Sequence, residues 1–320
     1  VEGLVKAHEE ISKTAPSVYE PVAKARISFI KKNEEQKNYF VPEYYLFIRS
    51  QPFLYRKRKF WESPRRFESV SKEEYKSHRE KFVRALKQVE SSLEQTRLKP
   101  QRLLDEEWFR ICFEYLNLSR AEKHNVPEMR SDVEPFSPLL NDQVSLTDVE
   151  VHRDSLKIGN YLFRPITLKT LPEGTTYSAM VNELTASLPF HFWISQNISI
   201  LDQTKERERL ELKRRIAHAM ASGSENVSDL ESESKLAHIE SLLRDLLEGS
   251  ERLVSMDFTV VIWAESKEKL EEKSDEVLKA FRSMGQSEGI IETLPAFDVF
   301  VESLPGSCTG VRHQKMKSSN

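Results

Sequence analysis

The stretch DFTVVIWAESKEKLEEKSDEVLKAF, residues 257–281, contains a strand signal followed directly by a helix signal. Its first part, Asp257–Glu265, is almost continuously apolar, which is typical of a central strand buried on both faces. Ser266 can then cap a helix, and Gly285 can end it. The apolar face of this helix comprises Leu270, Val277, Phe281 and Met284. The stretch therefore predicts a helix that packs on a central strand.

More strands and helices are predicted around this unit. The segment LKIGNYLF, Leu156–Phe163, predicts a hairpin, because Gly159-Asn160 can adopt the positive φ that a two-residue turn demands. Pro165 in the returning strand indicates an edge strand or a bulge. Four further elements are short: strands near 190–199 and 289–293, and helices near 177–187 and 297–303. The second half is therefore predicted to be α+β, with helices packed on a small sheet.

A charged helical pair is predicted between the strands at 190 and 257. Asp202 can cap the first helix, which runs to about Ala221, and Ser228 with Glu231 matches a capping box for the second. Six residues form an apolar stripe on the second helix: Leu236, Ile239, Leu242, Leu243, Leu246 and Leu247. Residues 205–215 carry six basic and three acidic side chains, whereas 225–251 carry eight acidic and two basic ones. The two helices should therefore attract each other.

The first half is predicted to be mainly helical, because no glycine occurs between Gly3 and Gly159. A capping box at Ser71–Tyr75 opens a helix predicted over Lys72–Gln95, with a stripe of Tyr75, Phe82, Leu86, Val89 and Leu93. A second helix is predicted near Asp105–Leu118, with a stripe of Trp108, Ile111, Cys112 and Tyr115. Before both, YYLFIR at Tyr44–Arg49 predicts a short buried strand.

Composition limits the classes of protein to consider. Hydrophobic residues make up 38% of the 320-residue chain and charged residues 31%, which favours long solvated helices around modest cores. The net charge of -3 creates no overall field toward nucleic acid or lipid. Two cysteines, Cys112 and Cys308, are too few for a disulfide framework and indicate a reducing compartment. The apolar run Phe258–Ala264 is too short to span a bilayer.

The sequence predicts no catalytic, cofactor-binding or metal-binding residues. Gly306 and Gly310 lack the spacing and the following Lys-Ser/Thr of a Walker A loop. The histidines are scattered, and neither cysteine has a second thiol within zinc-ligand spacing. We expect His191 to be a surface or structural residue, and Cys112 to be part of the core.

One basic and aromatic segment is a candidate contact surface. The segment YRKRKFWESPRRF, Tyr55–Phe67, carries six basic residues against Glu62, with aromatic residues interleaved. Cations can neutralise phosphates and aromatic faces can stack on bases, so nucleic acid is one partner. A protein or membrane surface is another, and a solvated loop without specific role is the third interpretation. The contact residues would be Arg56, Lys57, Arg58, Lys59, Arg65, Arg66 and Trp61.

The order of features resembles a known family. The matching stretches are DSLKIGNYLFRPITLKTLP, FHFWISQNIS, the charged helical pair, MDFTVVIWAESKEKLEEKSDEVLKAF, and FVESLPGS followed by RHQKMKSSN. Together they resemble the N-terminal region of the large ATPase of type IV secretion and conjugative DNA-transfer systems, the CagE/TrbE/VirB family. The resemblance covers roughly residues 30–320. In that family, a RecA-like motor follows the Ser/Thr-Ser-Asn stretch.

The sequence signals and the resemblance together predict three parts. Residues 1–130 would be a helix-rich subdomain with a short strand, and residues 140–306 an α+β subdomain with the helical hairpin 202–248. Residues 307–320, which we expect to lack a docked helix or strand, would be a linker toward a missing C-terminal RecA-like ATPase domain. ATP and Mg would bind to that domain and not to these residues.

The resemblance also implies a function. We expect these residues to be a docking and oligomerisation domain, not itself an enzyme, of a cytoplasmic ATPase that lies peripherally on the bacterial inner membrane. Its partners would be inner-membrane components of a secretion machine, its own ATPase domain and other copies in a hexamer. The helical hairpin would be a partner-binding arm, or would merely cover the sheet. The alternative function is a free-standing nucleic-acid-binding adaptor that uses residues 55–67.

Overall fold

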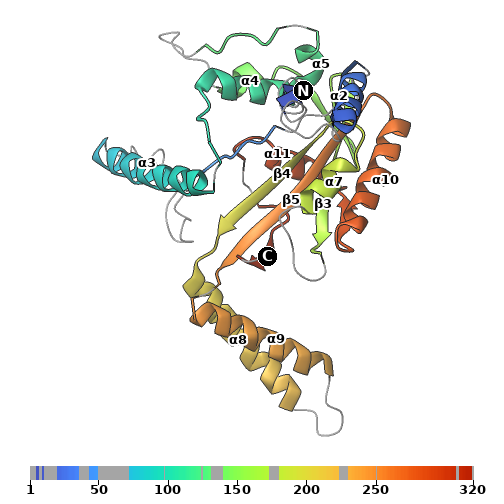
Figure 1. The fold of residues 1–320 in the computed structure, drawn as a ribbon. Helices are drawn as coiled ribbons and strands as arrows, with labels where there is room; N and C mark the ends of the chain where they lie inside the picture. The colour runs from blue at the N-terminus through green and yellow to red at the C-terminus, as the bar shows by residue number, and fades with distance from the viewer. Residues whose placement is uncertain are drawn as a thin grey trace.

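The protein is an α+β structure built around one antiparallel sheet, as the sequence predicts. In this computed structural model (Figure 1), helices lie against both faces of the sheet and a helical pair projects from one end. The structure describes residues 5–6, 9–10, 20–35, 43–49, 72–96, 98–123, 125–130, 140–172, 180–222, 230–249, 251–307 and 310–318.

The sheet comprises seven strands, all of them paired antiparallel. Five follow the order β1-β2-β3-β5-β4, while β6 pairs with β3 beyond β2, and β7 pairs with β5 beyond β3. Their bounds are β1 Val149–Val151, β2 Leu156–Ile158, β3 Tyr161–Thr170, β4 Phe192–Ile200, β5 Leu253–Ala264, β6 Glu288–Ile291 and β7 Gln314–Lys317.

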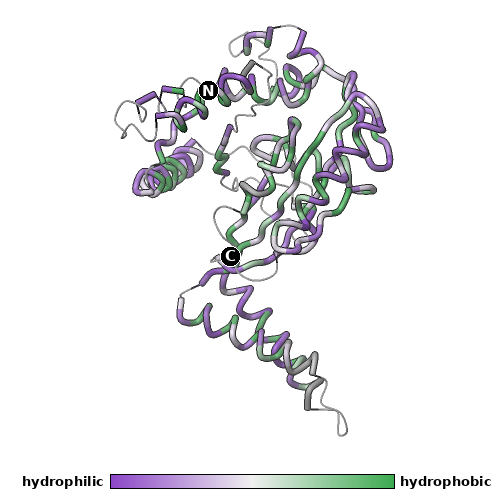
Figure 2. Tube along the Cα trace, turned by 45° about the vertical axis from the view of Figure 1, so that its right-hand side comes forward, coloured by the Kyte–Doolittle hydropathy of each residue, from purple (hydrophilic) through white to green (hydrophobic). Residues whose placement is uncertain are grey.

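The predicted strand and helix at 257–281 form the centre of the fold. Strand β5 lies between β3 and β4 and is buried along nearly its whole length. Ser266 caps α10 (Lys267–Ser283) by accepting a hydrogen bond from the backbone N–H of Lys269 at 3.4 Å. The core on this face comprises α7 (Met180–Ala186), α10 and the even-numbered residues of β5. Figure 2 shows hydrophobic residues gathered along the long central strands of the sheet.

The hairpin at Gly159 is confirmed. Of the two interpretations of Pro165, the edge strand is wrong, whereas β3 does contain an irregularity, a register shift in its pairing with β6 between Leu168 and Thr170. Strand β3 is central, and Pro165 lies opposite Val261 of β5. On the other side of β3, pairing with β2 stops at Phe163 and pairing with β6 begins at Ile166. The backbone carbonyl of Pro165 accepts a hydrogen bond from the backbone N–H of Glu292 on this second side. The N–H and C=O of one strand residue point to the same side, so the position where proline lacks an N–H also faces this interruption. Proline is tolerated here because no ladder hydrogen bond is lost.

The two helices predicted in the first half are confirmed as α3 (Lys72–Gln95) and α4 (Asp105–Leu116), but the predicted strand is not. Three further helices were not individually predicted: α2 (Glu20–Glu35), α5 (Leu118–Ala121) and α6 (Leu140–Val144). Residues 43–49 form no strand, and Tyr44 and Leu46 are 79% and 66% exposed. No described strand pairs with this segment, so its backbone gains no ladder hydrogen bonds. The capping box at Ser71 lies outside the described residues.

Helices α4 and α5 pack against the second face of the sheet. The rings of Tyr115 and Trp193 lie 4.4 Å apart between centroids, and Leu116 and Leu118 join the same apolar cluster. Cys112 is buried in the neighbouring core, and burial raises the pKa of its thiol to about 11. Contacts therefore cross the predicted boundary between 130 and 140, whose place stays a prediction.

The helical pair is α8 (Gln203–Ser222) and α9 (Leu230–Leu247), and it extends past the ends of β4 and β5 (Figure 1). Asp202 caps α8, with Oδ1 accepting from the backbone N–H groups of Thr204 and Lys205 at 3.2 and 3.3 Å. Leu243 and Leu246 are buried, whereas Leu247 is 66% exposed. Leu247 is the last residue of α9.

Among the described residues, none of the helices combines the length and the apolar character that crossing a bilayer requires.

The short helix α11 (Ala296–Glu302) completes the second face of the sheet, where Phe300 contacts the rings of Phe163 and Trp193.

Candidate functional site at the C-terminal segment

Residues 310–318, named here the C-terminal segment, are docked on the sheet. Strand β7 pairs with residues 253–256 of β5, whereas β3 pairs with residues 259–264. The segment therefore satisfies the backbone groups of β5 that β3 leaves unpaired on that side. The expectation that residues 307–320 contain no docked strand is wrong, because this edge of β5 offers hydrogen bonds that a turn-rich sequence signal does not reveal.

Three buried carboxylates face the C-terminal segment. Asp257 of β5, Glu292 after β6 and Glu302 of α11 are only 4%, 1% and 4% exposed. The guanidinium of Arg312 donates two hydrogen bonds to Glu292, at 2.9 and 2.8 Å. This paired geometry compensates part of the cost of burying the Glu292 charge.

Glu302 holds the turn that precedes β7. Its carboxylate accepts hydrogen bonds from the backbone N–H groups of Gly310 and, at 2.8 Å, of Val311. Gly310 has a φ of +82°, and a Cβ added there would come within 2.1 Å of Nε2 of His313. Glycine is therefore required for two reasons, a left-handed backbone and direct packing against the imidazole.

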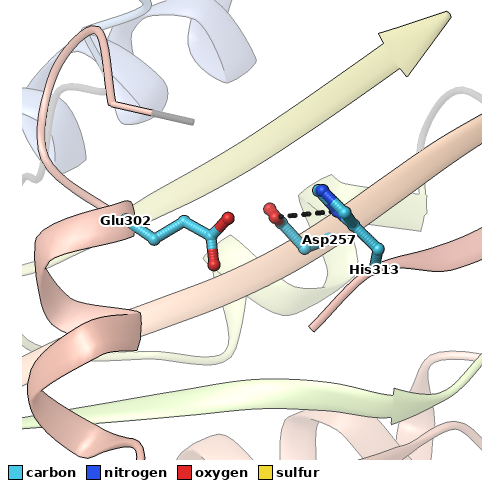
Figure 3. A group of neighbouring side chains, drawn as sticks. All are labelled: Asp257, Glu302 and His313. Carbon is cyan, nitrogen blue, oxygen red and sulfur yellow. Dashed lines mark ion pairs between the residues drawn. The ribbon is translucent and has the colours of Figure 1, made fainter. Parts of the chain in front are cut away.

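Asp257 lies between Glu302 and His313, as Figure 3 shows. Its Oδ1 accepts from the backbone N–H of Asn197 at 3.1 Å, whereas its Oδ2 is buried and accepts no hydrogen bond from the described residues. Nδ1 of His313 lies 3.5 Å from this Oδ2. Burial and the neighbouring Glu302 carboxylate raise the pKa of Asp257 to about 6. Both effects oppose a negative charge on Asp257 beside an ionised Glu302.

Strand β7 also contacts the helical pair. Lys315 forms an ion pair with Glu206 of α8, and Lys317 lies 2.5 Å from Asp245 of α9. Burial raises the pKa of Glu206, but Lys315 and Arg209 more than offset this, so the pKa lies below its ordinary value. The C-terminal segment therefore joins the sheet to both helices of the pair.

The sequence did not identify this site. The available signal was Asp257, a single acid within a nearly apolar strand. Glu302 and His313, however, lie 45 and 56 positions farther along the chain. The prediction of no metal-binding pattern considered local spacing, whereas Asp257, Glu302 and His313 each offer a ligand atom, all within 4.8 Å of one another. His191, for which we expected a surface or structural role, is not one of these three residues and lies directly before β4.

The predicted contact residues cannot be placed relative to this site. Arg56, Lys57, Arg58, Lys59, Arg65, Arg66 and Trp61 lie outside the described residues, so their role in binding nucleic acid or a partner stays a prediction.

Comparison with known proteins identifies the family. No curated protein matches the chain. A family model described as TraC protein matches residues 53–307, about four-fifths of the chain, and this span includes the sheet from β1 to β6, the helical pair, Asp257 and Glu302. The narrower resemblance to the CagE/TrbE/VirB family stays a prediction. The chain belongs to the TraC protein family, which acts in type IV secretion and conjugative transfer.

Proposed function

We propose that these residues are the docking and oligomerisation domain of an ATPase that energises type IV secretion. The observation that carries the proposal is the match of residues 53–307 to the TraC family, together with a sequence that contains no Walker A loop. The ATPase activity, with its ATP and Mg, would belong to a RecA-like domain that follows in the full protein. These residues would position that motor in the secretion machine.

The docked C-terminal segment supports a positioning role. It is tied to the sheet by Glu292 and Glu302 and to the helical pair by Glu206 and Asp245. A domain that follows such a segment is held by several contacts at once, so it has less orientational freedom than one on a free linker.

The helical pair supports a docking role. It extends away from the sheet, so most of its length covers no other described element (Figure 1). Figure 2 shows hydrophilic and hydrophobic residues alternating along both helices, and Leu212 and Ile216 of α8 are 57% and 48% exposed. We propose that this pair is the arm that contacts an inner-membrane component of the machine, which would place the protein peripherally on the membrane. Oligomerisation into a hexamer belongs to the same proposal.

A competition experiment tests the docking proposal. The 320-residue chain is produced in excess in cells that carry out conjugative transfer with the full-length protein. A docking domain without a motor should occupy the machine and lower the transfer frequency. The purified chain should show no ATP turnover above background.

The matched variant lacks residues 204–244, which removes most of the helical pair. Its sheet should remain folded by circular dichroism, and it should not compete, because the arm is absent. If the shortened chain competes as well as the whole chain, the arm is excluded but docking is not. If the whole chain, folded and abundant, leaves transfer unchanged, or if it hydrolyses ATP at an enzymatic rate, the proposed function is wrong.

A further inference from the structure

The group formed by Asp257, Glu302 and His313 lies outside everything that the proposed function requires. We propose that these three side chains bind one divalent transition-metal ion of the zinc class, which fastens the C-terminal segment to the sheet. The three residues come from three different elements: β5, α11 and the turn before β7.

The charge of the group favours a cation. Two carboxylates lie side by side at 4% exposure each, and two such groups cannot both be ionised without a compensating charge. Arg312 pairs with Glu292 and not with either of them. A divalent ion would balance both charges at once, whereas the imidazole of His313 supplies at most one positive charge.

The Oδ2 atom of Asp257 points independently to a ligand. It is buried, points into the group and accepts no hydrogen bond from any described residue. Burying a carboxylate oxygen without a hydrogen-bond partner is unfavourable, and more so when the group is charged. The other oxygen, Oδ1, is held by Asn197, so the side chain is oriented with Oδ2 toward the group.

The spacing of the atoms fits a metal better than a direct hydrogen bond. Nδ1 of His313 and Oδ2 of Asp257 are 3.5 Å apart, beyond the usual N–H···O range of about 2.7–3.2 Å. Two ligands at about 2.0–2.1 Å from a tetrahedral ion lie about 3.3 Å apart. All three ligand atoms lie within 4.8 Å of one another, so a modest movement of the Glu302 carboxylate would bring all three within bonding distance of one ion.

The surrounding hydrogen bonds resemble the supporting contacts of metal ligands. Backbone N–H groups of Gly310 and Val311 orient the Glu302 carboxylate and leave it lone pairs for a metal. One imidazole with two carboxylates favours zinc, cobalt or manganese over magnesium, which prefers an all-oxygen shell with several waters. His313 is the most exposed of the three, with 34% of its side chain accessible, so an ion can enter from this side.

Metal titration of the purified chain tests the proposal. After treatment with EDTA and its removal, the folded chain is titrated with Zn²⁺, with Co²⁺ as the spectroscopic probe and with Mg²⁺ as the hard-cation comparison. We expect one Co²⁺ per chain with the absorption of nitrogen and oxygen ligands, displaced by Zn²⁺ but not by Mg²⁺. NMR of the His313 imidazole should shift on addition of Zn²⁺, which requires no variant. Zn²⁺ should also raise the unfolding temperature.

The variants Asp257→Asn and His313→Ala should each weaken Co²⁺ binding at least about tenfold. Asp298→Asn, an exposed acid on the same helix as Glu302, and His152→Ala, an exposed histidine, should leave it unchanged. The proposal is overturned if the folded wild-type chain shows no saturable binding of Co²⁺ or Zn²⁺, which would mean that a shared proton balances the carboxylates. Binding that survives both variants, or leaves the His313 imidazole unshifted, overturns it equally. None of these outcomes depends on whether the chain docks to a secretion machine.

Discussion

The two faces of β5 are built from different chemistry. The even-numbered residues from Met256 to Ala264 are apolar and pack against α7 and α10. On the other face, Ser255, Asp257 and Thr259 form a buried polar stretch between the apolar residues Leu253 and Val261, and Asp257 faces the C-terminal segment and α11. The apolar face therefore stabilises the fold through burial, whereas the polar face specifies which segment docks, because buried polar groups tolerate only matching partners.

The largest effect is expected on the apolar face. Phe281 of α10 is fully buried and its ring meets that of Phe258 edge to face, with centroids 6.1 Å apart. Phe281→Ala should lower the free energy of unfolding by about 3–5 kcal/mol, because it removes apolar burial and leaves a cavity. Urea denaturation measures the loss. The control Leu294→Ala, at a side chain 94% exposed, should stay within about 0.5 kcal/mol; similar losses for both would mean that this face is not the core.

Exchanging polarity at two adjacent residues separates the faces directly. Val260→Thr places a hydroxyl on the apolar face and should cost about 1–3 kcal/mol, because no partner awaits it. Thr259→Val removes a weak contact, 3.4 Å, between the hydroxyls of Thr259 and Thr167, and should cost about 1 kcal/mol or less. Thermal unfolding of both variants gives the ranking, and the reverse order would contradict the assignment of the faces.

Removing a cation from the C-terminal segment tests the buried acids. Arg312→Ala leaves the Glu292 carboxylate unpaired at 1% exposure and should cost about 1–3 kcal/mol. Adding Glu292→Gln should restore part of the loss, because the uncompensated charge disappears. Arg153→Ala, an exposed arginine, is the control. If adding Glu292→Gln to Arg312→Ala lowers the free energy of unfolding by as much as Glu292→Gln does alone, the two side chains act independently and the pairing is refuted.

A similarly small effect is expected where the C-terminal segment meets α8. Because the pKa of Glu206 is lowered, its stabilising contribution is present above the pKa of the unfolded chain and is lost as pH falls through the lower folded value. Glu206→Gln should cost about 1 kcal/mol at pH 7, and the difference from wild type should shrink below the ordinary pKa of 4.5. Unfolding curves from pH 7 to pH 3 measure this, and a difference that grows on acidification would contradict it.

Local sequence signals predicted the elements more reliably than their partners. Periodicity and caps located α3, α4, α8, α10 and the hairpin at Gly159, because helix and turn signals act over a few residues. The strand expected at 44–49 failed because strand formation depends on a neighbour that its own residues do not encode. Strand β7 was missed for the converse reason: Gln314–Lys317 has no strand pattern, but β5 supplies the pairing.

The candidate site was out of reach for the same reason. An acid within an apolar strand, such as Asp257, is a visible anomaly, yet its meaning depends on Glu302 and His313, which only the folded sheet brings near. The surroundings of a buried charge are set by long-range contacts, whereas helix, turn and metal-ligand spacing patterns span only a few residues.

Hydrogen exchange of the full chain tests the central claim, that buried carboxylates hold the C-terminal segment on the polar face of the sheet. The amides of β7 and of β6 should both be protected for minutes or longer. In Glu302→Gln, which weakens the acceptor for Gly310 and Val311, protection of β7 should fall while that of β6 and α10 is kept. Amides of β7 that exchange at the rate of an unstructured chain in the wild type would contradict the account.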